Sequence, residues 1–169
     1  MKVVSTATEL RDALQERAGS SIGFVPTMGA LHEGHISLLR AAHRDSDVVV
    51  LSIFVNPLQF GPQEDLASYP RDHERDLDHA RTQEVDVVFL PSADEMYPPG
   101  TSTNVHVGAL GELFEGASRP GHFDGVATVV AKLFNLVHPD RAYFGQKDAQ
   151  QVAAIKKMTA DLSFPVEVV

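Results

Sequence analysis

The sequence predicts an α/β fold: a doubly wound, Rossmann-like domain with a mostly parallel sheet and helices on both faces. Strand-like and helix-like segments alternate along the chain, which is typical of such domains. Residues 48–55 form a continuous apolar run, rich in β-branched side chains, as expected of a parallel strand covered on both faces. The unusual polar residues follow the strand-like segments, where folds of this class bind ligands.

The first half of the chain is expected to contain three strands. Thr6 and Glu9 form a capping box that begins a helix, and Gly19 ends it. Asn56-Pro57 is a turn signal that ends the second strand. In chain order, the expected elements are a buried strand at 21–26, a helix at 34–44, a strand at 48–55, a loop at 57–70, a charged helix at 71–83 and a buried strand at 85–90.

The second half contains the strongest helical pattern, at residues 122–137. Its apolar side chains recur at i, i+3, i+4, i+7, i+8 and i+11, at Val126, Val129, Val130, Leu133, Phe134 and Val137. Pro139 ends this helix. The other expected elements are an irregular stretch at 92–104, a short strand at 104–107, a strand at 140–144, a turn at 145–148, a helix at 149–162 and a strand at 164–169.

Composition limits the classes of function. A chain of 169 residues is long enough for one domain. The formal net charge of −9 disfavours a nucleic-acid surface. The chain contains no cysteine, which excludes disulfides and thiolate catalysis. No apolar run approaches the ~20 residues of a membrane span, and residues 1–6 lack a secretory apolar core. We therefore expect a cytoplasmic protein with no membrane or nucleic-acid partner.

The most informative motif is His32-Glu33-Gly34-His35, between a strand and a helix. Histidines three apart on a first helical turn point to the same side, and each can donate a hydrogen bond to an anion. The turn before the helix is expected to aim free backbone N–H groups at a phosphate. The alternatives are half of a metal site or two surface histidines, but no cysteine and no H-E-x-x-H pattern supports zinc. No G-x-G-x-x-G or Walker A sequence is present.

Ordered segments from about residue 20 to the end resemble the pantothenate synthetase (pantoate–β-alanine ligase) family, which belongs to the HIGH-motif nucleotidylyltransferase superfamily. The segments are residues 26–35, 52–60, 69–71, 95–98, 119–123, 125–130 and 142–148. The resemblance implies an ATP-dependent condensation in two steps. The carboxylate of (R)-pantoate attacks the α-phosphate of ATP to give pantoyl adenylate and pyrophosphate. The amine of β-alanine then releases pantothenate and AMP.

The resemblance also implies roles for particular residues. His35 matches the family's proton donor, and His32 and Lys147 would contact phosphates as its catalytic partners. Gln59 and Gln151 match the pantoate-binding glutamines, and Gln59 also meets β-alanine. The ATP-binding positions are Met28, Gly29, Ala30, Leu31, His32, Glu33, Gly34, His35, Gly145, Gln146, Lys147 and Asp148. The remaining expected substrate contacts are Pro26, Thr27, Asn56, Tyr69 and Arg119.

Magnesium is expected to be bound mainly by ATP oxygens, with Asp76 as a protein contact. Two positions depart from the family pattern: Gln146, where Glu is common, and Ala149, where an aromatic is common. Residues 1–169 are interpreted as one ATP- and pantoate-binding domain without a counterpart of the family's smaller C-terminal domain, whose Met-Ser-Ser-Arg-like loop closes over ATP. We therefore expect weak binding, poor turnover and, by resemblance, a homodimer.

Two other functions stay open from the sequence. The first is a different HIGH-type nucleotidylyltransferase, one that makes a dinucleotide or a CDP-alcohol and does not need Gln59 and Gln151. The second is a non-catalytic nucleotide-binding or dimerisation module.

Overall fold

The strands form one sheet in the order β1-β4-β3-β2-β5-β6, and all the described pairings are parallel. The computed structural model describes residues 1–61, 64 and 66–169. The strands are β1 (Lys2–Val4), β2 (Ile22–Thr27), β3 (Val48–Ile53), β4 (Val87–Phe89), β5 (Arg141–Ala142) and β6 (Glu167–Val168). The sheet grows from β2 in both directions, with β3 on one side and β5 on the other. The predicted doubly wound fold is confirmed.

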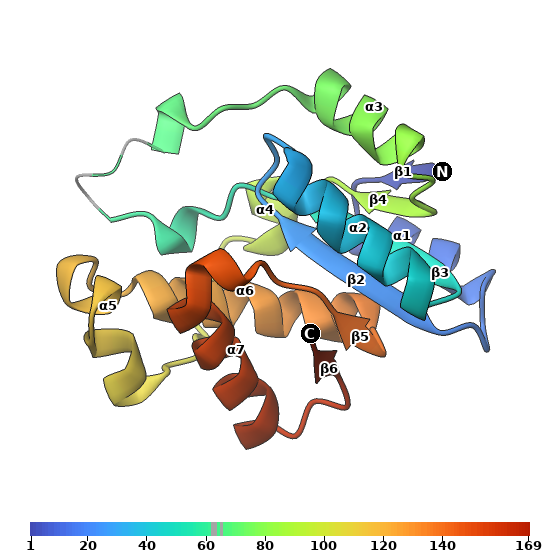
Figure 1. Ribbon diagram of the computed structural model, residues 1–169. Coiled ribbons are helices and arrows are strands. Elements are labelled where there is room, and N and C mark those ends of the chain that lie inside the picture. The colour runs from blue at the N-terminus through green and yellow to red at the C-terminus, as the bar shows by residue number, and fades with distance from the viewer. Residues whose placement is uncertain (62–63, 65) are drawn as a thin grey trace.

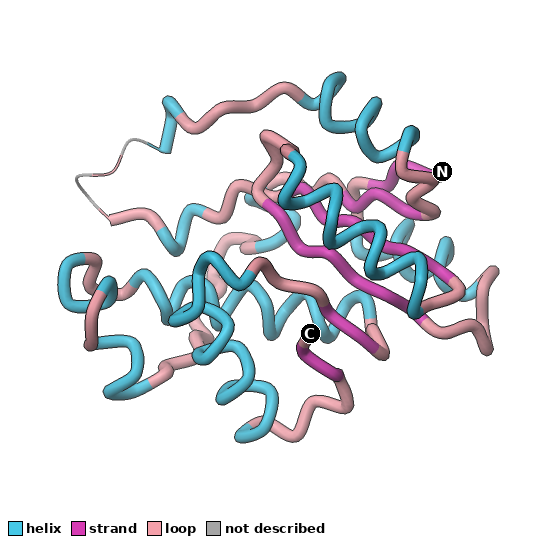
Figure 2. Tube along the Cα trace, in the orientation of Figure 1, coloured by secondary structure: helices cyan, strands magenta, loops and turns pink. Residues whose placement is uncertain are grey.

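Helices cover both faces of the sheet (Figure 1), and they alternate with the strands along the chain (Figure 2). The α-helices are α1 (Ala7–Gln15), α2 (Glu33–Asp45), α3 (His73–Thr82), α4 (Ala93–Met96), α5 (Glu115–Ser118), α6 (His122–Val137) and α7 (Ala149–Asp161). Single 3₁₀ turns lie at Pro57–Gln59 (η1), Leu66–Ser68 (η2), Gly108–Glu112 (η3) and Gln146–Asp148 (η4).

The sheet has one hydrophobic cluster on each face. The larger cluster packs side chains of α1, α6 and α7, such as Leu10, Phe134 and Ile155, against the sheet. The smaller one packs α2 and α3, through Leu39 and Ala80. All residues of β3 are buried. This burial explains the apolar run, interrupted only by Ser52, that predicted the strand, since a central parallel strand meets helices on both sides.

Helix α6 lies very close to the turn η1. An added Cβ on Gly125 would lie 2.3 Å from the carbonyl oxygen of Leu58 and 2.7 Å from the backbone nitrogen of Gln59. Only a residue without a side chain permits this approach. Gly125 therefore lets α6 hold η1, and with it Gln59, against the helix.

Most predicted elements are present with shifted ends. The capping box of Thr6 and Glu9 and the helix at 122–137 are confirmed. The strands expected at 85–90, 140–144 and 164–169 are shorter, as β4, β5 and β6. The stretch expected as a loop at 57–70 contains η1 and η2, and its residues 62–63 and 65 lie outside the described part. β1, α4 and α5 were not predicted.

The strand predicted at 104–107 is wrong. The backbone N–H of Val105 donates to Oγ1 of Thr128 at 2.9 Å, and that of Val107 donates to Oδ1 of Asp124 at 3.0 Å. Both acceptors are side chains of α6. The segment therefore satisfies its backbone donors on a helix surface and not in the sheet.

In the described part of the chain, no helix is long and apolar enough to cross a membrane.

Candidate active site

A cavity of about 270 Å³ lies at the carboxyl ends of β2, β3 and β5. We call it the histidine cavity. It sits where the strand order reverses between β2 and β5, the usual ligand position in doubly wound folds. Its lining residues are Pro26, Thr27, Met28, His32, His35, Phe54, Asn56, Gln59, Tyr69, Val126, Val129, Val130, Leu133, Phe144, Asp148 and Gln151.

His32 and His35 contact each other at the start of α2. His32 is the N-cap, and its Nδ1 accepts a hydrogen bond from the Gly34 N–H at 3.0 Å. Nδ1 of His35 accepts from the His32 N–H at 3.4 Å, and the two ring centroids are 4.1 Å apart. Since each Nδ1 is an acceptor, each neutral ring has its hydrogen on Nε2. The pair therefore has two N–H donors that the helix start does not use.

His35 is neutral at physiological pH. Burial, and after it the neighbouring His32, lower the pKa of His35 to about 4, while Asp76 opposes the shift. Desolvation disfavours the charged imidazolium, and a second ring close by adds like-charge repulsion. His35 can therefore donate a hydrogen bond from Nε2, but it does not carry a second ring proton.

Three of the backbone amides in the turn before α2, which were expected to be free for a phosphate, have partners within the protein. The buried Asp76 of α3 accepts from the Ala30 N–H at 2.9 Å and from the Leu31 N–H at 2.7 Å. The Gly29 N–H donates to Oγ1 of Thr27 at 3.2 Å. Gly29 and Ala30 both have positive φ, 87° and 51°. The turn is thus shaped around a carboxylate of the protein, and the Nε2–H groups of the two imidazoles are donors that this carboxylate does not engage.

Gln59 is positioned through its side chain. Its Oε1 accepts from Nδ2 of Asn56 at 3.0 Å, and Nδ2 also donates to the Gly125 carbonyl at 3.0 Å. Oδ1 of Asn56 accepts from the Tyr97 hydroxyl at 2.9 Å. Burial raises the pKa of Tyr97, so its hydroxyl keeps its proton. Since Oε1 of Gln59 is engaged, its Nε2 is the donor left for a ligand.

Asn56 and Tyr97 therefore support Gln59. Asn56 lines the histidine cavity, as predicted for a substrate contact, but its amide group is engaged by protein partners. Sequence reasoning gave Tyr97 no role, although it stands in one of the segments that resemble the family. The resemblance of that segment to the family was the signal that could have pointed to Tyr97.

The other side of the histidine cavity comes from β5 and α7. Gln151, Asp148 and Phe144 line it together with apolar residues of α6. Lys147, Gln146 and Gly145 are exposed on the adjoining turn and do not line the cavity. A ligand in the cavity would meet amides and apolar side chains, and an anion that extends out of it would meet His32 and Lys147.

The predicted residues divide into those that line the histidine cavity and those that do not. Pro26, Thr27, Met28, His32, His35, Asn56, Gln59, Tyr69, Asp148 and Gln151 line it. Gly29, Ala30 and Leu31 form the turn behind it, and Glu33 and Gly34 are exposed on the first turn of α2. Arg119 does not line the histidine cavity.

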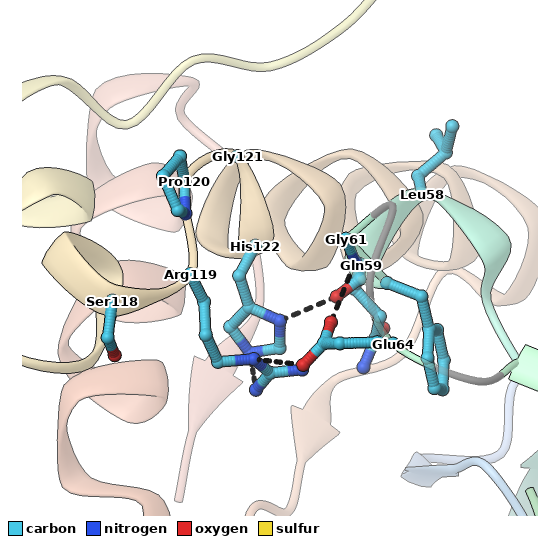
Figure 3. A pocket seen from close by; sticks show the side chains of 10 residues that line it. Leu58, Gln59, Gly61, Glu64, Ser118, Arg119, Pro120, Gly121 and His122 are labelled. Carbon is cyan, nitrogen blue, oxygen red and sulfur yellow. Dashed lines mark hydrogen bonds and ion pairs between the residues drawn. The ribbon is translucent and has the colours of Figure 1, made fainter.

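Arg119 lines a second cavity of about 510 Å³, which we call the arginine cavity (Figure 3). It is lined by Leu58, Gln59, Phe60, Gly61, Glu64, Ser118, Arg119, Pro120, Gly121 and His122. Nε of Arg119 donates to Glu64 at 2.7 Å, and Nη1 donates to Glu115 at 2.8 Å and to Nε2 of His122 at 3.2 Å. Gln59 lines both cavities.

No group of three or more His, Asp or Glu that could hold a metal ion occurs among residues 1–61, 64 and 66–169. Each carboxylate oxygen of Asp76 already accepts a backbone N–H, and the residue is 1% exposed. These residues do not fit a magnesium site built by the protein. Magnesium contact by Asp76 stays an untested prediction.

The fold and the histidine cavity define a parallel α/β domain with a ligand site at the carboxyl ends of its strands. The family model of pantoate-beta-alanine ligase matches residues 2–169. The chain belongs to this family.

Two relatives, one compared by sequence and one by structure, agree with this assignment. The pantothenate synthetase of Moorella thermoacetica is 58% identical over 171 residues, which cover 100% of this chain and 60% of the relative. A crystal structure of pantothenate synthetase from Thermus thermophilus matches with a TM-score of 0.96 and 57% identity, over 100% of this chain and 60% of the other. The chain thus spans about 60% of the length of these relatives.

A further structure, of the pantoate-beta-alanine ligase from Francisella tularensis, is complexed with beta-gamma ATP and beta-alanine. It is 39% identical to this chain with a TM-score of 0.94, and the match covers 100% of this chain and 66% of the other.

Proposed function

We propose that this chain binds (R)-pantoate and ATP at the histidine cavity and contributes to their condensation with β-alanine. In this reaction the pantoate carboxylate attacks the α-phosphate to give pantoyl adenylate and pyrophosphate. The β-alanine amine then gives pantothenate and AMP. The observation that best supports the proposal is the grouping of two Nε2–H imidazoles, two carboxamides and an apolar helix face around one cavity.

The lining of the histidine cavity suits a small branched hydroxy acid. Val126, Val129, Val130 and Leu133 of α6 form an apolar wall for methyl groups. Gln59 and Gln151 lie in the same cavity, and their neutral amides can donate to a carboxylate or hydroxyl group without repelling it or cancelling its charge. A volume of about 270 Å³ is just below the range of typical small-ligand pockets, so the nucleotide must extend beyond it.

In the first step the pantoate carboxylate must approach the ATP phosphates, although both are anions. The imidazoles can reduce this electrostatic repulsion. The Nδ1 atoms of His35 and His32 are both engaged at the helix start, so each ring has an Nε2–H that can donate to a phosphate. Donors that are already oriented stabilise the developing charge of the transition state more than mobile water does. Lys147, exposed at η4, adds a positive charge on a flexible stem. The protein's contribution is thus mainly positioning and charge stabilisation.

The same geometry leaves the phosphate side of the site open. His32, Gln146 and Lys147 are exposed, whereas an acyl adenylate must be kept from water. We therefore propose that these 169 residues alone bind substrates weakly and turn over poorly. Magnesium is proposed to arrive on the ATP oxygens. The homodimer and the cytoplasmic location suggested by the resemblance stay predictions, and light scattering in solution tests the first.

Calorimetry with pantoate tests the proposed function. Gln151→Glu places a carboxylate beside the bound acid, so we expect the dissociation constant of pantoate to rise at least about tenfold, the effect of ~1.4 kcal/mol. Gln83→Glu is the matched control, because it makes the same charge change next to Arg40, away from the histidine cavity. Pantoate that binds the Gln151→Glu variant as tightly as the original chain would refute the proposal.

A further inference from the structure

Lys132 is a half-buried lysine on the largely buried helix α6. Its Nζ donates a hydrogen bond to the carbonyl of Met96, the last residue of α4. Nζ also lies over the ring of Tyr97, 5.7 Å from the ring centroid. No carboxylate in residues 1–61, 64 and 66–169 pairs with it. Because burying a charged group is costly unless its contacts replace water, these two contacts account for the position of the ammonium group.

Both contacts hold the point where α4 ends. The last carbonyls of a helix have no partner within the helix, and Met96 is 0% exposed, so its carbonyl needs a donor from the protein. Tyr97 follows directly as the C-cap of α4, and an ammonium group over an aromatic face is attracted to the ring. Lys132 therefore holds the backbone at the end of α4 and the ring that comes next.

Tyr97 in turn determines the orientation of the Asn56 amide. Oδ1 of Asn56 accepts from the Tyr97 hydroxyl at 2.9 Å and from the Leu58 N–H at 3.3 Å. Nδ2 donates to Oε1 of Gln59 and to the Gly125 carbonyl, both at 3.0 Å. A carboxamide has two donors and two acceptor positions, so all of them are occupied in a residue that is 1% exposed. A flipped amide would bring Nδ2 against the Leu58 N–H and Oδ1 against the Gly125 carbonyl.

Helix α6 supports this network at two points. Gly125, Val129 and Lys132 stand at i, i+4 and i+7, so they lie along one stripe of the helix. Gly125 packs against the backbone of η1, Val129 lines the histidine cavity, and Lys132 holds the end of α4. The two segments that orient Gln59 are therefore fixed on the same stripe that faces the cavity.

We propose that Lys132 is a positioning residue for the acid substrate. By holding Tyr97, it fixes the amide of Asn56 and so makes Gln59 direct its Nε2 donor group into the histidine cavity. Lys132 does not line that cavity, so it acts through these residues and not by touching the substrate. This inference rests on the proposed function, in which Gln59 binds the acid.

The nucleotide side of the cavity is expected to be independent of Lys132. His32 and His35 are oriented by contacts at the start of α2, and the turn before α2 is held by Asp76 of α3. None of these contacts involves Lys132 or Tyr97. Loss of Lys132 should therefore weaken binding of the acid and leave binding of the nucleotide unchanged, a difference that general destabilisation would not produce.

The experiment follows the 169-residue chain by NMR. In Lys132→Met, which keeps a long side chain but removes the ammonium group, we expect the side-chain amide signals of Asn56 and Gln59 to shift. In titrations the dissociation constant of pantoate should rise at least about fivefold, equivalent to ~1 kcal/mol, whereas that of a non-hydrolysable ATP analogue should change by less than about twofold. Lys156→Met is the matched control, because it removes an exposed lysine of α7 and should change neither constant.

A second variant separates positioning from general packing. Tyr97→Phe keeps the ring but removes the hydroxyl that donates to Asn56, so it should also weaken pantoate binding and shift the amide signal of Gln59. Because Lys132→Met and Tyr97→Phe act through the same amide, their effects on the free energy of pantoate binding should be clearly less than additive in the double variant.

The inference is overturned if the amide signal of Gln59 is unchanged in Lys132→Met, if pantoate and the ATP analogue lose affinity equally, or if the two substitutions are additive. Should Lys132→Met not fold, Tyr97→Phe decides, and an unchanged Gln59 signal or equal losses for both ligands would overturn the inference. An original chain that binds no pantoate would refute the proposed function, whereas the amide signals would still show whether Lys132 orients Gln59.

Discussion

At the scale of single residues, the central feature is a histidine pair that uses its Nδ1 atoms to cap a helix. This use determines the tautomers, because the capping nitrogens accept from Gly34 and His32 and leave Nε2–H on each ring. Burial then keeps His35 uncharged. These contacts support the proposed role of the pair as hydrogen-bond donors to phosphate, whereas a role as a proton donor requires that the triphosphate first raise the pKa of His35.

Replacing His32 by Asn tests this interpretation. Asn is a good N-cap and can still accept from the Gly34 N–H, but it removes the neighbouring ring that lowers the pKa of His35. We expect the midpoint of His35, measured by NMR of its ring protons, to rise from about 4 toward the ordinary value of 6.5.

His106 serves as the internal control in the same spectra. Asp124 holds the pKa of His106 above its ordinary value, at 2.8 Å from its Nδ1, and this should not change in the variant. An unchanged or lower His35 midpoint would contradict the assigned coupling between the two rings.

At the scale of elements, the turn before α2 depends on α3. Asp76 on α3 accepts the N–H groups of Ala30 and Leu31, and an added Cβ on Gly29 would lie 2.9 Å from Oδ2 of Asp76. The turn and the carboxylate are therefore complementary in shape and in hydrogen bonding. One buried side chain from a distant helix orients the start of α2 and the two histidines on it.

Asp76→Asn measures this support. The substitution replaces one acceptor by an amide donor and leaves a buried N–H without a partner, which costs about 1–3 kcal/mol. We expect the free energy of unfolding in urea to fall by that amount. Asp78→Asn, on the same helix and with a side chain 75% exposed, should change it by less than about 0.5 kcal/mol. Equal losses in the two variants would contradict the role of Asp76.

The elements also show what sequence could and could not predict. Local signals were sufficient for the capping box of α1 and the long apolar face of α6, because a helix is defined by near neighbours. β1 was missed because its short segment gains strand structure only by pairing with β4, far along the chain. The donors of Val105 and Val107 and the Asp76 contact were missed for the same reason, since tertiary partners decide them.

At the scale of the whole molecule, the strand order explains why the histidine cavity forms where it does. β2 is flanked by β3 and β5, which lie far apart in the chain. Their carboxyl ends bring together His35, Gln59 and Gln151 around the histidine cavity. Ten of the residues expected in the site from the resemblance to the family line this cavity. The others do not line it: Gly29, Ala30, Leu31, Glu33, Gly34, Asp76, Arg119, Gly145, Gln146 and Lys147.

The most direct test is a crystal structure of the chain with pantoate and a non-hydrolysable ATP analogue. The account predicts density for the acid between Gln59, Gln151 and the valines of α6, with phosphate oxygens within hydrogen-bond distance of Nε2 of His32 and His35. Phosphate density remote from both imidazoles, or an acid bound outside the histidine cavity, would contradict it.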